Sequence, residues 1–273
     1  MPARRPQPRK RRAAAAGLTV AAAIAGVAVI AGASRSPPLR PAETSAAVGA
    51  LPAPVAPAFT PGAPRRLGSI RHVSYWGPVE RSVTARTAPS YTAQAVSRLS
   101  PRTPEGTRNA VAVLERKQDR EGTLWVRVSL AVLPNGTTAW VPRTALGGYG
   151  TVRTRLDVDL IRLRATLYRD GRAVFEAAIG IGTVTSPTPT GQFYIRNKLT
   201  RYRSPAYGPV AFGTSARSPW ATDWPAGGFV GIHGTDRPDL IPGMVSHGCI
   251  RMRNRDILEL ARRMPVGTPV TIH

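Results

Sequence analysis

Between residue 68 and the end of the chain, many short segments alternate apolar and polar residues and are separated by turn signals. In Trp125–Leu130, valine or leucine occupies every second position, which is typical of a half-buried strand. A Pro-Asn-Gly turn signal follows at 134–136, and Asp170-Gly171 separates two more alternating segments. Short strands joined by tight turns predict a mainly β protein, built as a β-sandwich or barrel with one or two helices.

The alternating segments divide into two predicted domains, a small all-β module over residues 68–150 and a second β domain over residues 151–273. The strands expected in the first are 83–86, 110–116, 125–130 and 138–142. The strands expected in the second are 156–160, the two arms of the hairpin around 170–171, a strand that begins at 193, and 267–272.

Three segments of the second domain are expected to form other structures. The glycines and prolines of 180–189 predict a loop, and 200–228, rich in Pro, Gly, Tyr and Trp without a period, predicts a long surface loop. Residues 256–263 give the clearest helix pattern, with Asn254 as the expected N-cap. The expected apolar stripe of this helix consists of Ile257, Leu258, Leu260 and Ala261.

The N-terminus has the layout of an export signal. Six basic residues lie within 4–12, and an uncharged stretch rich in Ala, Val and Ile follows at 13–33. This stretch can be a cleaved signal peptide or a transmembrane anchor helix, because roughly 20 apolar residues span a bilayer. Residues 34–67, rich in Pro and Ala, predict an extended linker. The bulk of the chain is therefore expected outside the cytoplasm, in the cell wall or periplasm, secreted or anchored to the cytoplasmic membrane.

The chain carries a formal net charge of +23 at pH 7. Such basicity suits either nucleic acid or an anionic surface, such as lipid headgroups or acidic wall polymers. The sequence has no helix-turn-helix pattern, no zinc-finger spacing and no RNA-binding aromatic signature, so nucleic acid is not expected as a partner. Anionic cell-wall polymers fit the charge, and the membrane is a partner if the N-terminal segment is uncleaved.

The residues that carry chemistry are concentrated between His233 and Arg251. Cys249 is the only cysteine of the chain, so its thiol cannot form an internal disulfide. His233 and His247 both lie within 16 positions of it, and a neighbouring imidazole can take the thiol proton to create a reactive thiolate. In an extended segment His247 and Cys249 would share a face, so spacing alone does not choose between the two histidines as the base.

These residues together resemble the signature of the L,D-transpeptidases, the YkuD-type catalytic domain. Ser246–Cys249 matches the family's Ser/Thr-His-Gly-Cys motif, and His233 precedes the cysteine by 16 positions. Upstream, Ser186–Ile195 (SPTPTGQFYI) is similar to the family's Thr-Pro-x-Gly-x-Phe segment. The resemblance covers essentially the whole second domain, and implies a β-sandwich-like L,D-transpeptidase catalytic domain.

The resemblance implies a role for each residue of the motif. Cys249 would be the nucleophile, and His233 would be the general base and then the general acid. His247 and Ser246 would shape the site. The main-chain amides of Gly248 and Cys249 would stabilise the oxyanion that forms during attack on a carbonyl.

Two further residues complete the expected substrate-binding side of the site, together with Ser246. Arg251 stands where one variant of the family has Asn, and both pairing with a substrate carboxylate and a structural role stay open for it. Gly234 directly follows His233 and has no side chain to orient the imidazole. A backbone carbonyl would therefore have to orient that ring.

The first domain resembles a bacterial SH3-like barrel. The run from Glu121 to Leu146 contains a Trp-Val-x-Val strand, a hairpin and a closing Trp-Val-Pro segment. Modules of this kind often bind wall peptides or glycan, or pack on an enzyme. Trp125 and Trp140 are accordingly ligand-stacking or packing residues, with packing the more frequent role of such residues.

The family resemblance implies a peptidoglycan L,D-transpeptidase. Cys249 would attack a tetrapeptide stem, release D-Ala and pass the acyl group to an amine of a neighbouring stem, giving a 3→3 crosslink. Water as the acceptor would make the protein an L,D-carboxypeptidase, and a protein amine would make it a wall-anchoring acyltransferase. This chemistry needs no metal or organic cofactor.

Two competing classes of function, a zinc site and a binding scaffold, are also open to this sequence. His233, His247 and Cys249 are ligand types that Zn²⁺ accepts, with water in the fourth position. Alternatively, the protein is a non-catalytic peptidoglycan-binding scaffold whose first domain is the working part.

Overall fold

The structure, a computed structural model, describes residues 62–67, 72–200, 204–221 and 227–273. The predicted signal or anchor segment at 1–33 and most of the predicted linker at 34–67 lie outside the described residues, and both stay predictions. Within the described ranges, no helix is long and apolar enough to cross a membrane.

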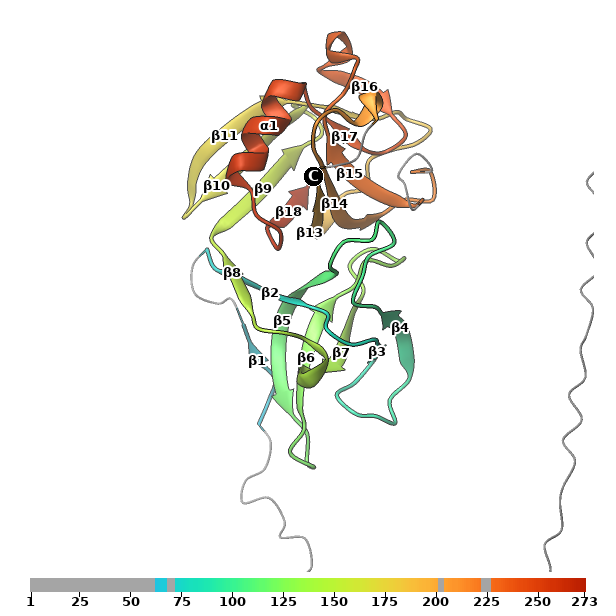
Figure 1. Cartoon of the computed structure of the whole chain (residues 1–273), viewed down its shortest axis with the longest axis vertical. Helices are drawn as coiled ribbons and strands as arrows, with labels where there is room; N and C mark the ends of the chain where they lie inside the picture. Colours follow the sequence, from blue (N-terminus) through green and yellow to red (C-terminus); the bar gives the residue numbers. More distant parts are fainter. Residues whose placement is uncertain (1–61, 68–71, 201–203, 222–226) are drawn as a thin grey trace, which may run out of the picture. The chain divides into compact units, whose positions relative to one another are not determined.

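Eight strands form the first sheet, coloured blue to yellow-green in Figure 1. These strands are β1 (Arg65–Arg66), β2 (Ser74–Pro78), β3 (Val83–Arg86), β4 (Ala95–Leu99), β5 (Ala110–Gln118), β6 (Leu124–Ser129), β7 (Thr138–Pro142) and β8 (Gly150–Val152). They follow the order β4-β3-β7-β6-β5-β2-β8, with β1 paired to β5 and a short 3₁₀ turn, η1 (Arg143–Ala145), after β7. All four strands expected in this part of the chain are present. The likeness to an SH3-like barrel and the domain boundaries stay predictions.

The short strand β1 differs from the expectation for its segment. Arg65 and Arg66 fall inside the predicted linker, yet they pair with Arg116 and Glu115 of β5. This strand consists of two arginines, so it has no apolar residue whose alternation could have predicted it.

Both tryptophans that the sequence singles out are buried side chains of the first sheet. Trp125 is fully buried, and its indole Nε1 donates a hydrogen bond of 2.7 Å to Asp119 Oδ2. Trp140 is buried as well, and the ring of Trp125 packs edge-on against Tyr91, with 4.9 Å between the ring centroids. Val126 and Val128 point to the opposite face of the strand from Trp125 and belong to the apolar core of the sheet. The packing role is therefore confirmed for both rings, and the ligand-stacking role is wrong because neither ring is accessible to a ligand.

Ten strands form the second sheet, and most of its neighbouring pairs are antiparallel. These strands are β9 (Thr154–Asp159), β10 (Arg164–Arg169), β11 (Arg172–Ala178), β12 (Gly180–Gly182), β13 (Gly191–Leu199), β14 (Ala211–Arg217), β15 (Phe229–His233), β16 (Gly243–Ser246), β17 (Ile250–Arg251) and β18 (Pro269–Ile272). Their order is β11-β10-β9-β18-β13-β14-β15-β17-β12-β16, and two 3₁₀ turns, η2 (Pro205–Tyr207) and η3 (Pro238–Leu240), lie in the connections. The expected mainly β fold class is confirmed.

The hairpin predicted around Asp170-Gly171 is formed by β10 and β11. Asp170 and Gly171 both have positive φ, 52° and 81°, as a two-residue type I′ turn requires. Leu156 and Val158 of the neighbouring β9 are fully buried, in agreement with the alternation in the sequence.

The prediction of a loop over 180–189 is wrong for its first three residues, which form β12. This strand pairs with β16 and β17 in the interior of the molecule. A Cβ atom on Gly182 would lie 2.2 Å from the Ser186 carbonyl oxygen and 2.6 Å from the Thr188 nitrogen. The glycines here therefore mark a close backbone approach rather than a turn.

The prediction of a long surface loop over 200–228 is also wrong, because β14 lies within it. The first six residues of β14 are all buried, and the strand sits between β13 and β15. A strand buried on both faces has no polar alternation, so a period-2 pattern cannot reveal it. Its polar residues are satisfied internally, as shown by Thr214, whose hydroxyl donates 2.7 Å to the Val230 carbonyl.

The one α-helix in the described part of the chain is α1 (Asn254–Arg263), which lies against the strands β9–β11 in Figure 1. Ile257 and Leu260 are fully buried in the core of the second sheet, as predicted. Leu258 is 39% exposed, so its place on the apolar stripe was wrongly expected. It follows Ile257 by one residue, and consecutive residues of a helix point in directions about 100° apart.

Asn254 is not the N-cap that the sequence predicts. The N-cap position belongs to Arg253, and Asn254 is the first residue of the helix. Its side-chain Oδ1 instead accepts a hydrogen bond of 3.0 Å from the main-chain nitrogen of Thr235. Asn254 therefore ties the start of α1 to the chain that follows β15.

Candidate active site

Two parallel strands bring the predicted site residues together. β15 ends at His233, and it pairs with β17 so that Ile232 lies opposite Ile250 and His233 opposite Arg251. Cys249 directly precedes β17. His233, the last residue of β15, and Cys249, which directly precedes β17, are thereby brought to neighbouring segments of one sheet.

The sulfur of Cys249 is buried and receives a main-chain hydrogen bond. The residue is 5% exposed, and the Gly231 N–H points to Sγ at a donor–acceptor distance of 3.3 Å. An N–H aimed at sulfur stabilises negative charge on it, which favours the nucleophilic form of the residue.

The imidazole of His233 is oriented by the backbone carbonyl of the next residue. Its Nδ1 lies 2.6 Å from the Gly234 oxygen, and because a carbonyl only accepts, Nδ1 is the protonated nitrogen. The Nε2 of the same ring is then the nitrogen with a lone pair that can accept a proton. The expectation that a carbonyl rather than a side chain orients this ring is confirmed.

Gly234 itself is required by close packing. A Cβ atom on Gly234 would lie 2.3 Å from Asn254 Oδ1 and 3.0 Å from the Gly208 Cα. Gly208, which directly follows η2, and the side chain of Asn254 therefore pack closely against the residue that orients His233. This contact explains Gly234 structurally, and its expected part in substrate binding stays a prediction.

The Ser-His-Gly-Cys segment is folded into a tight bend. The Ser246 hydroxyl donates 2.5 Å to the Cys249 carbonyl and accepts a 3.1 Å hydrogen bond from the Gly248 N–H. Gly248 has a φ of 112°, a conformation that side chains with a Cβ rarely adopt. The Gly248 amide, which the resemblance assigns to the oxyanion, is thus directed at Ser246 in this structure.

His247 is placed differently from the two other members of the motif. It is exposed, whereas Cys249 and His233 are buried. The argument that His247 and Cys249 share a face assumed an extended segment, and it fails because the positive φ of Gly248 turns the chain between them. His233 is therefore the histidine that shares the buried interior with the thiol.

Arg251 carries an unusual polar atom. Its Nε is buried and finds no hydrogen-bond partner within the part of the chain that the structure describes. Buried polar groups without a partner are rare in folded proteins and often mark a ligand site. Arg251 is a residue of β17, and its register partner on the neighbouring strand is His233.

Three residues that the sequence did not single out also build the site. The Thr188 hydroxyl donates 3.0 Å to the Gly248 carbonyl and accepts from the Gly182 N–H, so the Thr-Pro-x-Gly-like segment supports the bend. The Tyr207 ring lies 4.4 Å from the His233 ring, and Tyr207 and Phe229 share one buried cluster with Cys249. Thr188 falls in a motif that was noticed, but Tyr207 lies in the segment that was expected to be a surface loop.

The geometry does not form a metal site from these residues. Among the described residues, no group of three or more His, Cys, Asp or Glu side chains is arranged to bind a metal ion. The zinc alternative, which required His233, His247 and Cys249 to converge, therefore has no support in the arrangement of these side chains.

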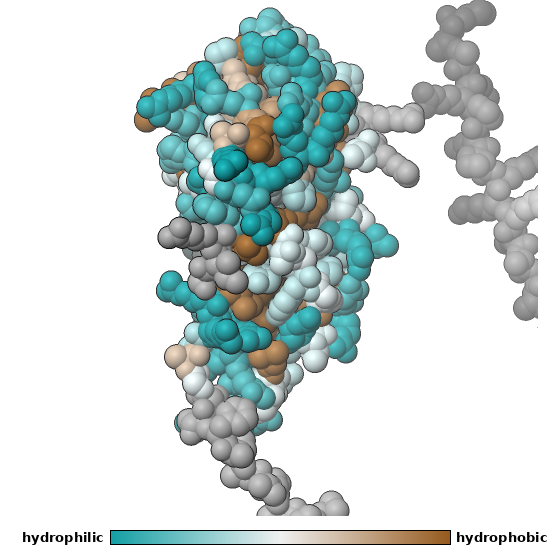
Figure 2. Space-filling view, turned by 90° about the vertical axis from the view of Figure 1, so that its left-hand side faces the viewer, coloured by the Kyte–Doolittle hydropathy of each residue, from teal (hydrophilic) through white to brown (hydrophobic). Residues whose placement is uncertain are grey.

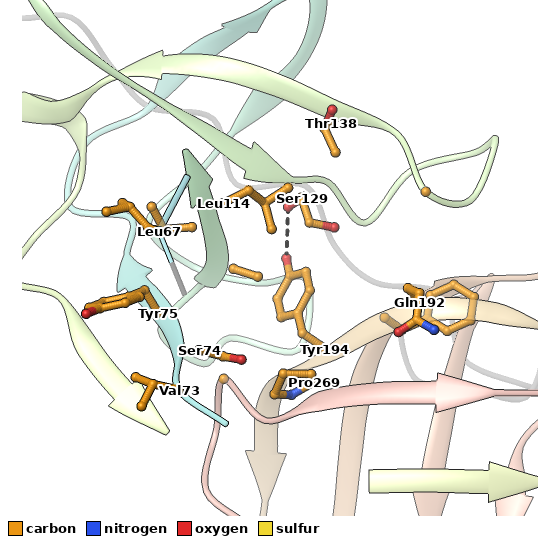
Figure 3. Close-up of a pocket in the computed structure, with 15 residues that line it drawn as sticks. Leu67, Val73, Ser74, Tyr75, Leu114, Ser129, Thr138, Gln192, Tyr194 and Pro269 are labelled. Atoms are coloured by element: carbon orange, nitrogen blue, oxygen red, sulfur yellow. Dashed lines mark hydrogen bonds between the residues drawn. The ribbon is translucent and has the colours of Figure 1, made fainter. Parts of the chain in front are cut away.

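A separate cavity of about 320 Å³ is lined by residues of both sheets and by none of the predicted site residues. In Figure 3 the Tyr194 hydroxyl points from the second sheet to the Ser129 carbonyl, to which it donates a hydrogen bond of 3.3 Å. Burial raises the pKa of Tyr194, so the phenol stays a neutral donor. This polar contact orders the cavity wall, and neither a cysteine nor a histidine is among the described residues that line the cavity.

Comparisons with known proteins agree on one family. Residues 153–272 match the family profile described as the YkuD L,D-transpeptidase catalytic domain. YkuD of Bacillus subtilis, assigned as an L,D-transpeptidase, is 39% identical over 123 residues, which cover 45% of this chain and 68% of that protein. YkuD of Bacillus licheniformis is 37% identical over 122 residues, which cover 45% of this chain and 67% of that protein.

A solved structure of the same kind is also similar. The catalytic domain of an Enterococcus faecium L,D-transpeptidase shares 29% sequence identity, with 44% of this chain and 96% of that domain covered and a TM-score of 0.35. On the identity and coverage of the two Bacillus proteins, this chain belongs to the L,D-transpeptidase family.

Proposed function

We propose that the protein is a peptidoglycan L,D-transpeptidase in which Cys249 is the nucleophile and His233 the general base and acid. The observation that carries the proposal is the pairing of β15 with β17. This pairing brings the segment of Cys249 beside the strand that ends in His233. The buried thiol accepts a hydrogen bond from the Gly231 N–H, and Nδ1 of His233 is hydrogen-bonded to the Gly234 carbonyl. A nucleophile, a base and a group that orients the base are the elements of cysteine acyl transfer.

In the first half-reaction, Nε2 of His233 accepts the thiol proton and the Cys249 sulfur attacks the carbonyl carbon of the stem's bond to D-Ala. The carbonyl oxygen becomes an oxyanion, which main-chain N–H groups stabilise. The imidazolium then gives its proton to the leaving amine as the C–N bond breaks. D-Ala departs, and the stem stays attached to Cys249 as a thioester.

In the second half-reaction, the side-chain amine of a neighbouring stem attacks the thioester carbonyl. His233 accepts the proton of that amine, the C–S bond breaks, and the thiolate of Cys249 is restored. The product carries a new amide between two stems. Water in place of the amine gives a shortened stem, which is the L,D-carboxypeptidase outcome.

Arg251 is proposed to bind a carboxylate of the stem. Its buried Nε, without a partner among the described residues, can be satisfied by an anionic group of the substrate. A guanidinium matches the two oxygens of a carboxylate with two parallel hydrogen bonds.

The proposed place of action is outside the cytoplasm, against the cell wall. Hydrophilic residues predominate on the face drawn in Figure 2, with hydrophobic residues in small separate areas. Arg66, Arg162 and Arg255 have side chains that are 84%, 79% and 81% exposed. Each of these three arginines also pairs with a carboxylate, so the attraction to acidic wall polymers and acidic stems depends on the net charge of +23.

The test is a product analysis with a disaccharide–tetrapeptide fragment of peptidoglycan. Mass spectrometry of the reaction should show release of D-Ala and a covalent dimer of the fragment, and both should vanish in Cys249→Ala. D-Ala release without dimer would assign the carboxypeptidase reaction to the same site. Intact substrate with the folded wild-type protein would reject the proposal.

A further inference from the structure

A buried ion pair joins the first sheet to the second. Glu105 lies between β4 and β5 of the first sheet, and Arg196 lies on β13 of the second. Arg196 Nη1 donates to Glu105 Oε2 at 2.9 Å, and Nη2 donates to the other carboxylate oxygen. The two side chains are only 3% and 2% exposed, so a full charge of each sign is enclosed in the protein.

Neighbouring polar groups fix this pair in one geometry. Arg196 Nε donates 3.1 Å to the Thr214 carbonyl of β14. The Asn197 side-chain nitrogen lies 3.2 Å from Glu105 Oε2 and 3.0 Å from the Thr107 hydroxyl. Because both partners have several hydrogen bonds, the pair is rigid in a way that an exposed surface pair is not.

The same guanidinium packs on an aromatic ring of the candidate active site. Arg196 Cζ lies 3.7 Å from the centroid of the Phe229 ring, and Arg217 Cζ lies 4.0 Å from it. Two guanidinium groups this close to one centroid occupy opposite faces of the ring, because on one face they would overlap. Phe229 is therefore sandwiched between two cations, an arrangement that favours the ring electrostatically.

Phe229 in turn packs in the cluster that surrounds the thiol. Phe229, Tyr207 and Cys249 belong to one buried cluster, and Ala131 of the loop after β6 packs against that cluster. Contacts thus run from Glu105 to Arg196, from Arg196 to Phe229, and from Phe229 into the surroundings of Cys249. Each step is a direct contact or membership of the same packed cluster.

The charge of Glu105 stabilises this arrangement. Arg196 and Arg217 carry like charges on the two faces of one ring, and burial and the charge of Arg196 lower the pKa of Arg217 while Glu105 raises it. Removing the carboxylate would leave two cations that repel each other across the ring, without the anion that now pairs with Arg196. The ring between them would lose its fixed position.

We propose that Glu105 is a positioning residue for the Cys249 site, acting through Arg196 and the sandwiched ring of Phe229. The first sheet would then form part of the enzyme's active-site support, rather than act only as a wall-binding module. The inference rests on the proposed function, since it assumes that Cys249 forms an acyl-enzyme.

The experiment measures the rate of thioester formation on the full chain with a carbapenem-type acylating agent, by intact mass over time. Glu105→Gln removes the charge but keeps the shape of the side chain, and we expect its acylation rate to fall about 10- to 100-fold. The matched control is Glu80→Gln, because Glu80 forms an exposed pair with Arg108 in the loops that flank strands of the first sheet. The control should stay within about twofold of wild type.

A double variant separates positioning from simple stability. Replacing a buried ion pair by apolar residues often restores stability, so Glu105→Leu with Arg196→Met should regain the thermal midpoint that Glu105→Gln loses. Positioning predicts that its acylation rate stays low, whereas recovery of both midpoint and rate would overturn the inference. If wild type is acylated and Glu105→Gln is acylated at the same rate, the inference is also overturned, whereas the proposed function is unaffected. A wild-type protein that forms no adduct would instead reject the proposed function.

Discussion

At the scale of single residues, the candidate site depends on how one imidazole is held. Gly234 supplies the carbonyl that engages Nδ1 of His233, and Tyr207 lies against the face of the same ring. With both constraints the ring presents Nε2 as its basic nitrogen. His247, which is exposed, has no comparable burial.

This difference between the histidines predicts different effects of their removal. His233→Ala should lower the rate of Cys249 acylation by about 10²- to 10⁴-fold, the usual contribution of general acid–base catalysis. His247→Ala should lower it by less than about tenfold, because that side chain is not enclosed with the thiol. Stopped-flow loss of carbapenem absorbance gives both rates, and a larger loss in His247→Ala than in His233→Ala would reverse the assignment.

Some of these residues could be predicted from the sequence and others could not. Cys249, His233 and Ser246 stand out because a short motif contains them, and the structure brings all three into one buried region. Tyr207 and Phe229 carry no such motif, since their place in the site depends on strands that meet from distant parts of the sequence. The direction of the Gly248 amide was missed because it depends on a single backbone angle.

At the scale of secondary-structure elements, the bend that carries Cys249 is supported from below by β12. Thr188 connects the two, since its hydroxyl accepts from the Gly182 N–H and donates to the Gly248 carbonyl. The close approach of Gly182 to the backbone at Ser186 and Thr188 makes this connection short. The position of the active-site bend therefore depends on β12.

Gly182→Ala is expected to disturb both stability and activity. Its Cβ would lie 2.2 Å from a backbone oxygen, and overpacking of this kind typically costs about 1–3 kcal/mol of the free energy of unfolding. The clash would displace Ser186–Thr188, and the Thr188 hydroxyl is hydrogen-bonded to the Gly248 carbonyl, so acylation should slow as well. Chemical denaturation with Gly148→Ala as control tests this, since a Cβ there meets none of the described atoms within 4 Å. Equal unfolding free energies for the two variants would contradict the expected strain.

Elements with alternation were predicted well, and elements without it were not. The bounds of β7 and the hairpin of β10 and β11 follow from turn residues and period-2 patterns that act locally. β12 and β14 are enclosed on both faces and rich in small residues, so their strand character comes from neighbours that a local pattern does not contain.

At the scale of the whole molecule, the described contacts between the two sheets include a buried phenol. Tyr194 is 3% exposed, and its hydroxyl donates to the Ser129 carbonyl of β6. Together with the ion pair of Glu105 and Arg196, this hydrogen bond makes the stability of the second sheet depend on the first.

The raised pKa of Tyr194 predicts a loss of stability at alkaline pH. Burial raises its pKa above the ordinary 10.0, so its contribution is complete below about pH 10 and declines as the unfolded tyrosine ionises above that value. The decline should approach about 1.4 kcal/mol per pH unit. Tyr194→Phe should be about 1 kcal/mol less stable than wild type at pH 8 but should lose less stability between pH 10 and 11. Urea unfolding of wild type and Tyr194→Phe at pH 8, 10 and 11 measures the free energies of unfolding. A difference between the two proteins that is the same at all three pH values would contradict this expectation.

The central claim is that Cys249 carries the acyl group of the peptidoglycan stem. Its most direct test is intact-mass analysis of the full chain after incubation with a tetrapeptide stem or a carbapenem-type agent, followed by peptide mapping. The account predicts one covalent adduct per chain, located on Cys249 and absent from Cys249→Ala. A folded wild-type protein whose mass does not change, or an adduct on any other residue, would contradict it.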